Sequence, residues 1–174
     1  MRALAGALGC DLAWQARSLL SRTYDLVDHA APETGSFAML TVRRMSFVPH
    51  AEIESAGGRW SLRRAGFWRP RVLVLAGDAP APLATFTRTL GSGLLRFEDG
   101  RAYRWRRPSF WSLGRRFEDA DGMPVVSLHY RFGFPRGRGG VELGTGAERL
   151  PEAALLAGLG WYLVLLARRR SAAA

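Results

Sequence analysis

The segment 150–167 is apolar on every side of a helix, and this feature constrains the fold of the chain more than any other. Pro151 and Glu152 suit the first turn of a helix, and the arginines at 168–170 suit its last turn. A helix without a polar face must be enclosed by protein or by lipid. The chain must therefore build a shell around this helix or insert it into a bilayer.

Small residues within this segment favour enclosure by protein, because they reduce the girth of the helix on several sides. They are Ala154, Ala157, Gly158 and Gly160. The uncharged stretch is also shorter than the ~20 residues that a bilayer-spanning helix needs. The arginines that follow it would have to cross the membrane against the positive-inside tendency. We predict a buried core helix at 151–168, with a transmembrane helix at 151–167 as the alternative.

The sequence before this helix consists of short strand-like segments separated by turn residues. The predicted strands are Thr41–Phe47, Ala51–Ser55, Arg59–Arg64, Arg71–Ala76, Leu83–Arg88, Gly93–Glu98, Arg101–Arg107, Leu113–Glu118, Pro124–Arg131 and Gly140–Leu143. Strands of six or seven residues span ~20–23 Å, which matches the ~25 Å length of the helix. A mainly β (α+β) fold is expected, with a closed antiparallel barrel of about ten to twelve strands around the helix.

Two local predictions accompany this barrel. Leucines and Trp14 recur at roughly helical spacing between Asp11 and His29, which predicts an N-terminal helix. Asp99-Gly100 predicts a two-residue hairpin turn, in which Glu98 faces Arg101. The chain is thus divided into an N-terminal helical segment (1–40), the barrel with its helix (41–170) and a tail (171–174).

The basic charge of the chain comes entirely from arginine. Twenty-five arginines and no lysine give a net charge of +10 among 174 residues, and this usage is typical of GC-rich bacterial genomes. The charge predicts attraction to polyanions, which include anionic lipid surfaces, phosphorylated ligands and nucleic acid. Cys10 is the only cysteine, so an internal disulfide is excluded.

Arginine and aromatic residues alternate most densely between Arg104 and Arg116. Guanidinium groups bind phosphates, and exposed aromatic rings insert at a lipid interface or stack on bases. The candidate ligand-binding residues are Arg104, Arg106, Arg107, Trp111, Arg115 and Arg116. The predicted partner is an anionic lipid surface or a phosphorylated ligand, and a nucleic acid bound by the same residues is the alternative.

The sequence offers no recognisable catalytic or metal-binding motif. His29, His50 and His129 are scattered, without a carboxylate or cysteine at metal-ligand spacing. No serine lies in a nucleophile elbow. We therefore expect a non-enzymatic protein without metal or cofactor.

Four sequence motifs carry a resemblance to a known superfamily. They are Arg59-Trp-Ser-Leu-Arg-Arg64, Asp99-Gly-Arg-Ala-Tyr-Arg-Trp105, Phe117-Glu-Asp-Ala-Asp-Gly122 and Gly158-Leu-Gly-Trp-Tyr162. With about ten strands before an apolar helix, the region 41–170 resembles the tubby-like barrels, which include the LURP-one-related proteins and the phospholipid scramblases. It is similar to small bacterial members of unassigned function.

The resemblance implies a helix threaded through a barrel and association with lipid or a membrane surface. The chain lacks the cysteine cluster of the scramblases and a lysine to match a Lys-Arg phosphoinositide site, so scrambling is not inferred. We expect a cytoplasmic protein, with peripheral association at the inner membrane face.

Overall fold

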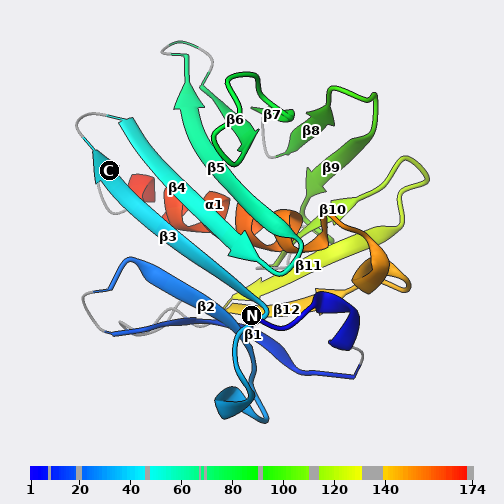
Figure 1. Cartoon of the computed structure of the whole chain (residues 1–174). Helices are drawn as coiled ribbons and strands as arrows, with labels where there is room; N and C mark the ends of the chain where they lie inside the picture. Colours follow the sequence, from blue (N-terminus) through cyan, green and yellow to red (C-terminus); the bar gives the residue numbers. More distant parts are fainter. Residues whose placement is uncertain are drawn as a thin grey trace.

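The described part of the chain forms a closed barrel of twelve antiparallel strands with one long helix inside it (Figure 1). This computed structural model describes residues 1–7, 9–18, 21–45, 48–66, 68, 70–89, 92–109, 114–130 and 139–171. The predicted fold class, a closed antiparallel barrel around a C-terminal helix, is confirmed.

The strands follow one another along the chain with short connections. They are β1 (Leu12–Ala16), β2 (Thr23–Asp28), β3 (Ala38–Met45), β4 (Val48–Ser55), β5 (Gly58–Ala65), β6 (Arg71–Ala76), β7 (Ala84–Arg88), β8 (Gly93–Phe97), β9 (Ala102–Arg106), β10 (Arg115–Glu118), β11 (Pro124–Tyr130) and β12 (Gly139–Leu143). The helix is α1 (Ala153–Ser171), and the 3-10 turns are η1 (Leu4–Gly6), η2 (Pro32–Thr34) and η3 (Ala147–Arg149).

Each strand pairs with its neighbours in the sequence, and the pairing of β1 with β12 closes the barrel. Side chains alternate between the two faces of each strand, so every second residue points inward. Leu40 of β3, Ile53 of β4 and Leu62 of β5 are completely buried in this way. The inward-facing side chains of the strands and the helix form one continuous hydrophobic core.

Two glycines allow α1 to fit inside the barrel. A Cβ on Gly158 would lie 2.7 Å from Cδ1 of Ile53, and one on Gly160 would lie 2.6 Å from Cδ1 of Leu128. The reverse arrangement also occurs, in which a glycine of the barrel wall accommodates a side chain of the helix. Gly139 of β12 leaves room for the ring of Trp161, and a Cβ on Gly139 would lie 2.2 Å from that ring. The small residues of the helix therefore serve close packing against the barrel wall, as the sequence predicts.

The first half of α1 is enclosed, and its second half is only partly covered. Residues 153–162 are buried, whereas 163 and 165–167 are half-buried and 168–169 are exposed. No helix in the described ranges has both the length and the hydropathy needed to cross a membrane.

The predicted helix from Asp11 to His29 is wrong, because this region contributes β1 and β2 to the barrel. Leu12 and Trp14 of β1 and Leu26 of β2 point into the core. β1 bonds to β2 on one side and to β12 on the other, so it is the strand that closes the barrel. Hydrogen bonding to a strand more than a hundred residues away outweighs the local spacing of leucines.

The β8–β9 hairpin differs by one residue from its predicted register. Leu95 faces Tyr103, and the Phe97 amide donates to the Arg101 carbonyl at 2.8 Å, so the turn has three residues. Gly100 has a φ of +91°, as in a turn that ends with a left-handed residue. Residues that pair directly across two strands point to the same face of the sheet. The observed register therefore pairs inward-facing residues with each other, whereas a shift of one residue would pair them with outward-facing residues.

Candidate functional site

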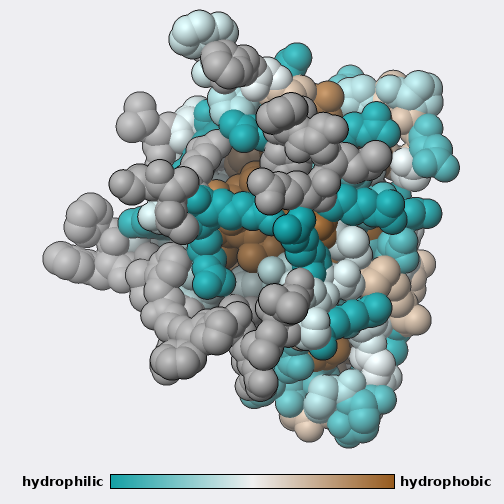
Figure 2. Space-filling view, turned by 90° about the vertical axis from the view of Figure 1, so that its left-hand side faces the viewer, coloured by the Kyte–Doolittle hydropathy of each residue, from teal (hydrophilic) through white to brown (hydrophobic). Residues whose placement is uncertain are grey.

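The two ends of the barrel carry different groups. The closed end is the end at which α1 begins, together with η1, η3 and the connections β2–β3, β4–β5, β6–β7, β8–β9 and β10–β11. The open end is the opposite one, at which α1 finishes and the remaining connections lie. Figure 2 views the molecule from the side on which α1 ends and shows apolar surface inside a hollow, with hydrophilic side chains around it.

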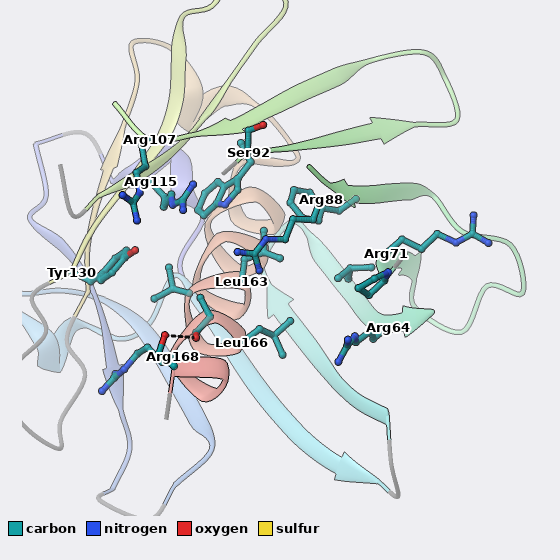
Figure 3. A pocket seen from close by; sticks show the side chains of 17 residues that line it. Arg64, Arg71, Arg88, Ser92, Arg107, Arg115, Tyr130, Leu163, Leu166 and Arg168 are labelled. Atoms are coloured by element: carbon teal, nitrogen blue, oxygen red, sulfur yellow. Dashed lines mark hydrogen bonds between the residues drawn. The ribbon is translucent and has the colours of Figure 1, made fainter. Parts of the chain in front are cut away.

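The hollow is a cavity of about 310 Å³ between the second half of α1 and the ends of the strands (Figure 3). Its floor is apolar and combines strand and helix residues: Val72, Phe86, Trp105, Leu163, Val164 and Leu166. Trp105 packs against Phe117 in the core, with ring centroids 4.6 Å apart. The cavity is therefore continuous with the hydrophobic interior of the barrel.

Arginines surround the mouth of this cavity. The open-end arginines are Arg64, Arg71, Arg88, Arg107, Arg115 and Arg168. Tyr130, Ser92 and Ser171 add hydroxyl groups, while no Asp or Glu is among the described residues that line the cavity. Within the described ranges, no carboxylate lies at ion-pair distance from Arg64, Arg71, Arg107 or Arg168.

The antiparallel topology explains why these arginines meet. A strand that runs toward the open end finishes where its neighbour begins. Arg64 lies near the end of β5, Arg71 starts β6 and Arg88 ends β7. Arg107 directly follows β9 and Arg115 starts β10. The last helical turns then add Arg168 from the centre of the barrel.

Acidic residues are absent from the connections at this end. The connecting sequences 17–22, 46–47, 66–70, 89–92, 107–114 and 131–138 contain no Asp or Glu. The closed-end connections, by contrast, contain eight of the 15 carboxylates, namely Glu33, Asp78, Glu98, Asp99, Asp119, Asp121, Glu148 and Glu152. The charge of the barrel is thus polarised along its axis, and a positive potential is concentrated at the open end.

The charge of the open end extends into the barrel. Burial raises the pKa of Tyr162 to about 12, and the charges of Arg169 and Arg64 act in the opposite direction. Tyr162 is completely buried in the enclosed half of α1. The two arginines therefore act electrostatically on a group in the core.

At the closed end, the carboxylate of Glu152 is 5 % exposed and has two donors. Tyr103 donates a hydrogen bond to Glu152 Oε1 at 2.6 Å, and Arg101 forms an ion pair with the same oxygen. Burial, followed by this hydrogen bond, raises the pKa of Tyr103. Glu152 precedes α1 and so connects the start of the helix to β9 and the β8–β9 turn. This polar cluster fixes one end of the core.

The residues predicted from the sequence lie on two surfaces. Arg107 and Arg115 line the mouth of the cavity. Arg104 and Arg106 point outward from β9, because the alternate residues Tyr103 and Trp105 are buried. Trp111 lies outside the described residues.

Two of the outer arginines hold a carboxylate. Arg116 binds Glu118 at 2.7 Å, and Arg106 lies 3.6 Å from the same side chain. Glu118 has only 4 % of its side chain exposed, so these arginines cover and neutralise it. Arg106 and Arg116 are therefore less suited to an external anion than the open-end arginines.

Sequence reasoning did not include Arg64, Arg71, Arg88 or Arg168 among the candidates. The signal was present, because each stands at the end of a strand or helix that leads to one edge of the barrel. This signal indicates a site only when it is known which strand ends lie together in the barrel.

A second cavity of about 440 Å³ lies on the outer wall near β4 and β5. Glu52 lines it together with Arg59 and also pairs with Arg43. This surface is electrically mixed, so it does not favour an anion. Within the described ranges, no cluster of three His, Cys, Asp or Glu residues could hold a metal ion.

No family model matches the chain, and neither a curated protein nor a solved structure is significantly similar to it. The function is therefore inferred from the geometry of the open end.

Proposed function

We propose that this protein is a non-enzymatic binding domain that attaches to an anionic lipid surface through the open end of its barrel. The observation that carries this proposal is the ring of six arginines around an apolar cavity, with no carboxylate among its described lining residues. Guanidinium groups bind phosphate oxygens in pairs and remain charged at all physiological pH values. Basic residues near an anionic leaflet each contribute about 1 kcal/mol to binding. Six of them are sufficient for reversible attachment of a small domain.

An exposed tryptophan at the same end supports this orientation. Trp68 lies in the β5–β6 connection, close in sequence to Arg71, and is 91 % exposed. Tryptophan is enriched at the boundary between lipid and water. We assign the role of interfacial anchor to Trp68, whereas the aromatic candidate predicted from the sequence is Trp111.

A nucleic-acid ligand is less consistent with the cavity. Proteins that bind single strands stack bases on exposed aromatic rings. Phe86 and Trp105 line the cavity but are only 2 % and 6 % exposed, so they offer little area for stacking. The apolar floor that they form is better suited to a hydrocarbon chain than to a nucleic-acid base.

The tubby-like resemblance remains part of the proposal. A barrel with a C-terminal helix inside it is the architecture that this resemblance implies, and lipid association is the property that its better-understood members share. Peripheral binding at the inner membrane face follows as the proposed location.

The test measures sedimentation of the protein with vesicles of phosphatidylcholine that contain phosphatidylglycerol, and with phosphatidylcholine alone. Arg64→Glu with Arg71→Glu should weaken binding to the anionic vesicles by more than about tenfold, because four charges change near the surface. The matched control is Arg96→Glu with Arg104→Glu on the outer wall, where both side chains are exposed. It has the same net charge and should change binding by less than about twofold.

Salt and an oligonucleotide complete the test. Binding should fall between about 0.1 M and about 1 M salt, as the Debye length decreases from about 10 Å to about 3 Å. Equal effects of the two double variants would reject the open end as the binding surface. Tighter binding of a single-stranded oligonucleotide than of vesicles at matched salt would replace lipid by nucleic acid.

A further inference from the structure

The cavity at the open end contains more than attachment to a charged surface requires. Exposed arginines alone would hold the protein to anionic headgroups. Here the arginines surround a recess whose floor consists of Val72, Phe86, Trp105, Leu163 and Leu166. Leu163 and Leu166 are only half-buried, so apolar area of the helix faces the recess (Figures 2 and 3). Apolar surface left in water is unfavourable, and an apolar occupant would remove that cost.

Polarity changes with depth in this cavity. The charged groups come from strand ends and from the last helical turns, so they lie at the mouth. The residues of the floor belong to the interior of the barrel and carry no charge. A matching ligand is therefore anionic at one end and hydrocarbon at the other.

The volume limits the size of the hydrocarbon part. About 310 Å³ lies at the lower end of the range of small-molecule sites. This space suits one chain of moderate length better than the two long chains of a bilayer phospholipid.

We propose that the cavity binds a single-chain anionic amphiphile, with its hydrocarbon chain against Phe86, Trp105 and Leu166 and its headgroup held by Arg64, Arg88 and Arg168. This inference rests on the proposed function, because the same open-end arginines carry both. It adds a stoichiometric ligand to a surface interaction. The headgroup can be a phosphate or a carboxylate, since arginine binds both in the same bidentate geometry.

The experiment uses three soluble probes that separate head from tail, all below their micelle concentrations. Dodecyl phosphate has both parts, glycerol phosphate has the head only, and dodecanol has the tail only. We expect one molecule of dodecyl phosphate to bind, more than about tenfold tighter than either of the others, because only it satisfies both parts of the site. Dodecanoate then distinguishes a carboxylate head from a phosphate head.

Tryptophan fluorescence reports where the chain lies. Dodecyl phosphate brominated near the end of its chain should quench Trp105, which lines the cavity. In the Trp105→Phe variant, most of this quenching should disappear while binding measured by calorimetry remains. Circular dichroism at each probe concentration checks that the amphiphile does not unfold the protein.

A variant that fills the cavity separates this inference from the proposed function. Ala167→Phe places a ring among the lining residues and leaves all six arginines unchanged. It should weaken dodecyl phosphate binding by more than about tenfold and leave binding to anionic vesicles unchanged, because the charge of the surface is the same. Ala120→Phe, in the exposed β10–β11 turn at the closed end, is the matched control and should affect neither.

Each outcome has a definite reading. Equal affinity for glycerol phosphate and dodecyl phosphate, full binding by the Ala167→Phe variant, or no fluorescence change with any probe would overturn the inference. In those cases, vesicle binding that still depends on Arg64 and Arg71 would leave the proposed function intact. If dodecyl phosphate binds as expected but vesicle binding does not depend on these arginines, the proposed function fails and the protein is a carrier of free amphiphiles.

Discussion

At the closed end of the barrel, the buried carboxylate of Glu152 is paired and packed, whereas at the open end arginines surround an apolar recess. Glu152 has Tyr103 and Arg101 as donors, and Arg101 also binds Asp99 at 2.8 Å. The open-end arginines repel one another, and no carboxylate is among the described residues that line their cavity. Paired charges at one end are explained by folding, but a ring of like charges lowers the stability of the fold. Folding therefore does not account for the arginines at the open end, and we attribute them to function.

The two halves of α1 should differ strongly in their tolerance of a larger side chain. Gly158→Leu should destabilise the fold by more than about 3 kcal/mol, because the side chain would overlap Ile53 of the barrel wall. Ala167→Leu, in the half-buried part of the helix, should change stability by less than about 1 kcal/mol. Urea unfolding followed by circular dichroism measures both variants.

A double mutant tests the cause of that effect. The milder Gly158→Ala change should be partly rescued by Ile53→Val, which removes the Cδ1 atom nearest to the added Cβ. Purely additive losses would mean that contact with Ile53 is not the reason for the glycine.

The second prediction concerns alkaline pH. The pKa of Tyr162 is about 12 in the folded protein and about 10 when unfolded, so the folded state favours the neutral phenol. Stability is therefore complete below about pH 10 and falls as the pH rises through about 12, by about 2–3 kcal/mol in total. Unfolding in urea at a series of pH values measures the slope.

Two variants define the origin of this slope. Tyr162→Phe should reduce it, and Arg169→Ala should raise the pKa of Tyr162 further, because the guanidinium charge lowers it. An unchanged slope in the Tyr162→Phe variant would show that Tyr103, whose pKa burial also raises, accounts for the alkaline instability.

A somewhat smaller loss is expected at the closed end. Glu152→Ala removes the acceptor of Tyr103 and should cost about 2 kcal/mol, because a buried hydroxyl loses its partner. Arg101 is about half exposed and can turn to water, which limits the loss. Glu98→Ala, an exposed carboxylate in the same region, should change stability by less than about 0.5 kcal/mol. Equal losses would contradict a special role of Glu152.

The smallest effect has the opposite sign. Arg71→Ala at the open end should leave stability unchanged or raise it by up to about 0.5 kcal/mol, because repulsion among the open-end arginines is relieved. The gain should vanish at about 1 M salt. A loss of more than about 1 kcal/mol would mean that Arg71 stabilises the fold and that the two ends are more alike than proposed.

The sequence was sufficient to predict most of the barrel, since its turns and alternating strands are local features. Ten of the twelve strands coincide closely with predicted segments, and α1 begins at Ala153, near the predicted start. The prediction failed where local signals were ambiguous. β1 and β2 lie in a leucine-containing stretch whose spacing also fits a helix, and Glu98 joins Asp99 and Gly100 in a turn of three residues instead of two.

The candidate site was predicted only in part. Arg107 and Arg115 are close together in the sequence and line the cavity, but their neighbours Arg106 and Arg116 bind Glu118 on the outer wall. Arg64, Arg88 and Arg168 are far apart in the chain and meet only because strands of opposite direction end at one edge.

Periodicity, turns and composition are properties of neighbouring residues, so they are sufficient to predict that this chain surrounds an apolar helix with strands and carries a large positive charge. The place at which that charge is concentrated depends on how the strands meet in space. Closing the barrel through β1 and β12 aligns the strand ends, and this alignment gathers arginines from four strands, the β9–β10 connection and one helix around a single cavity.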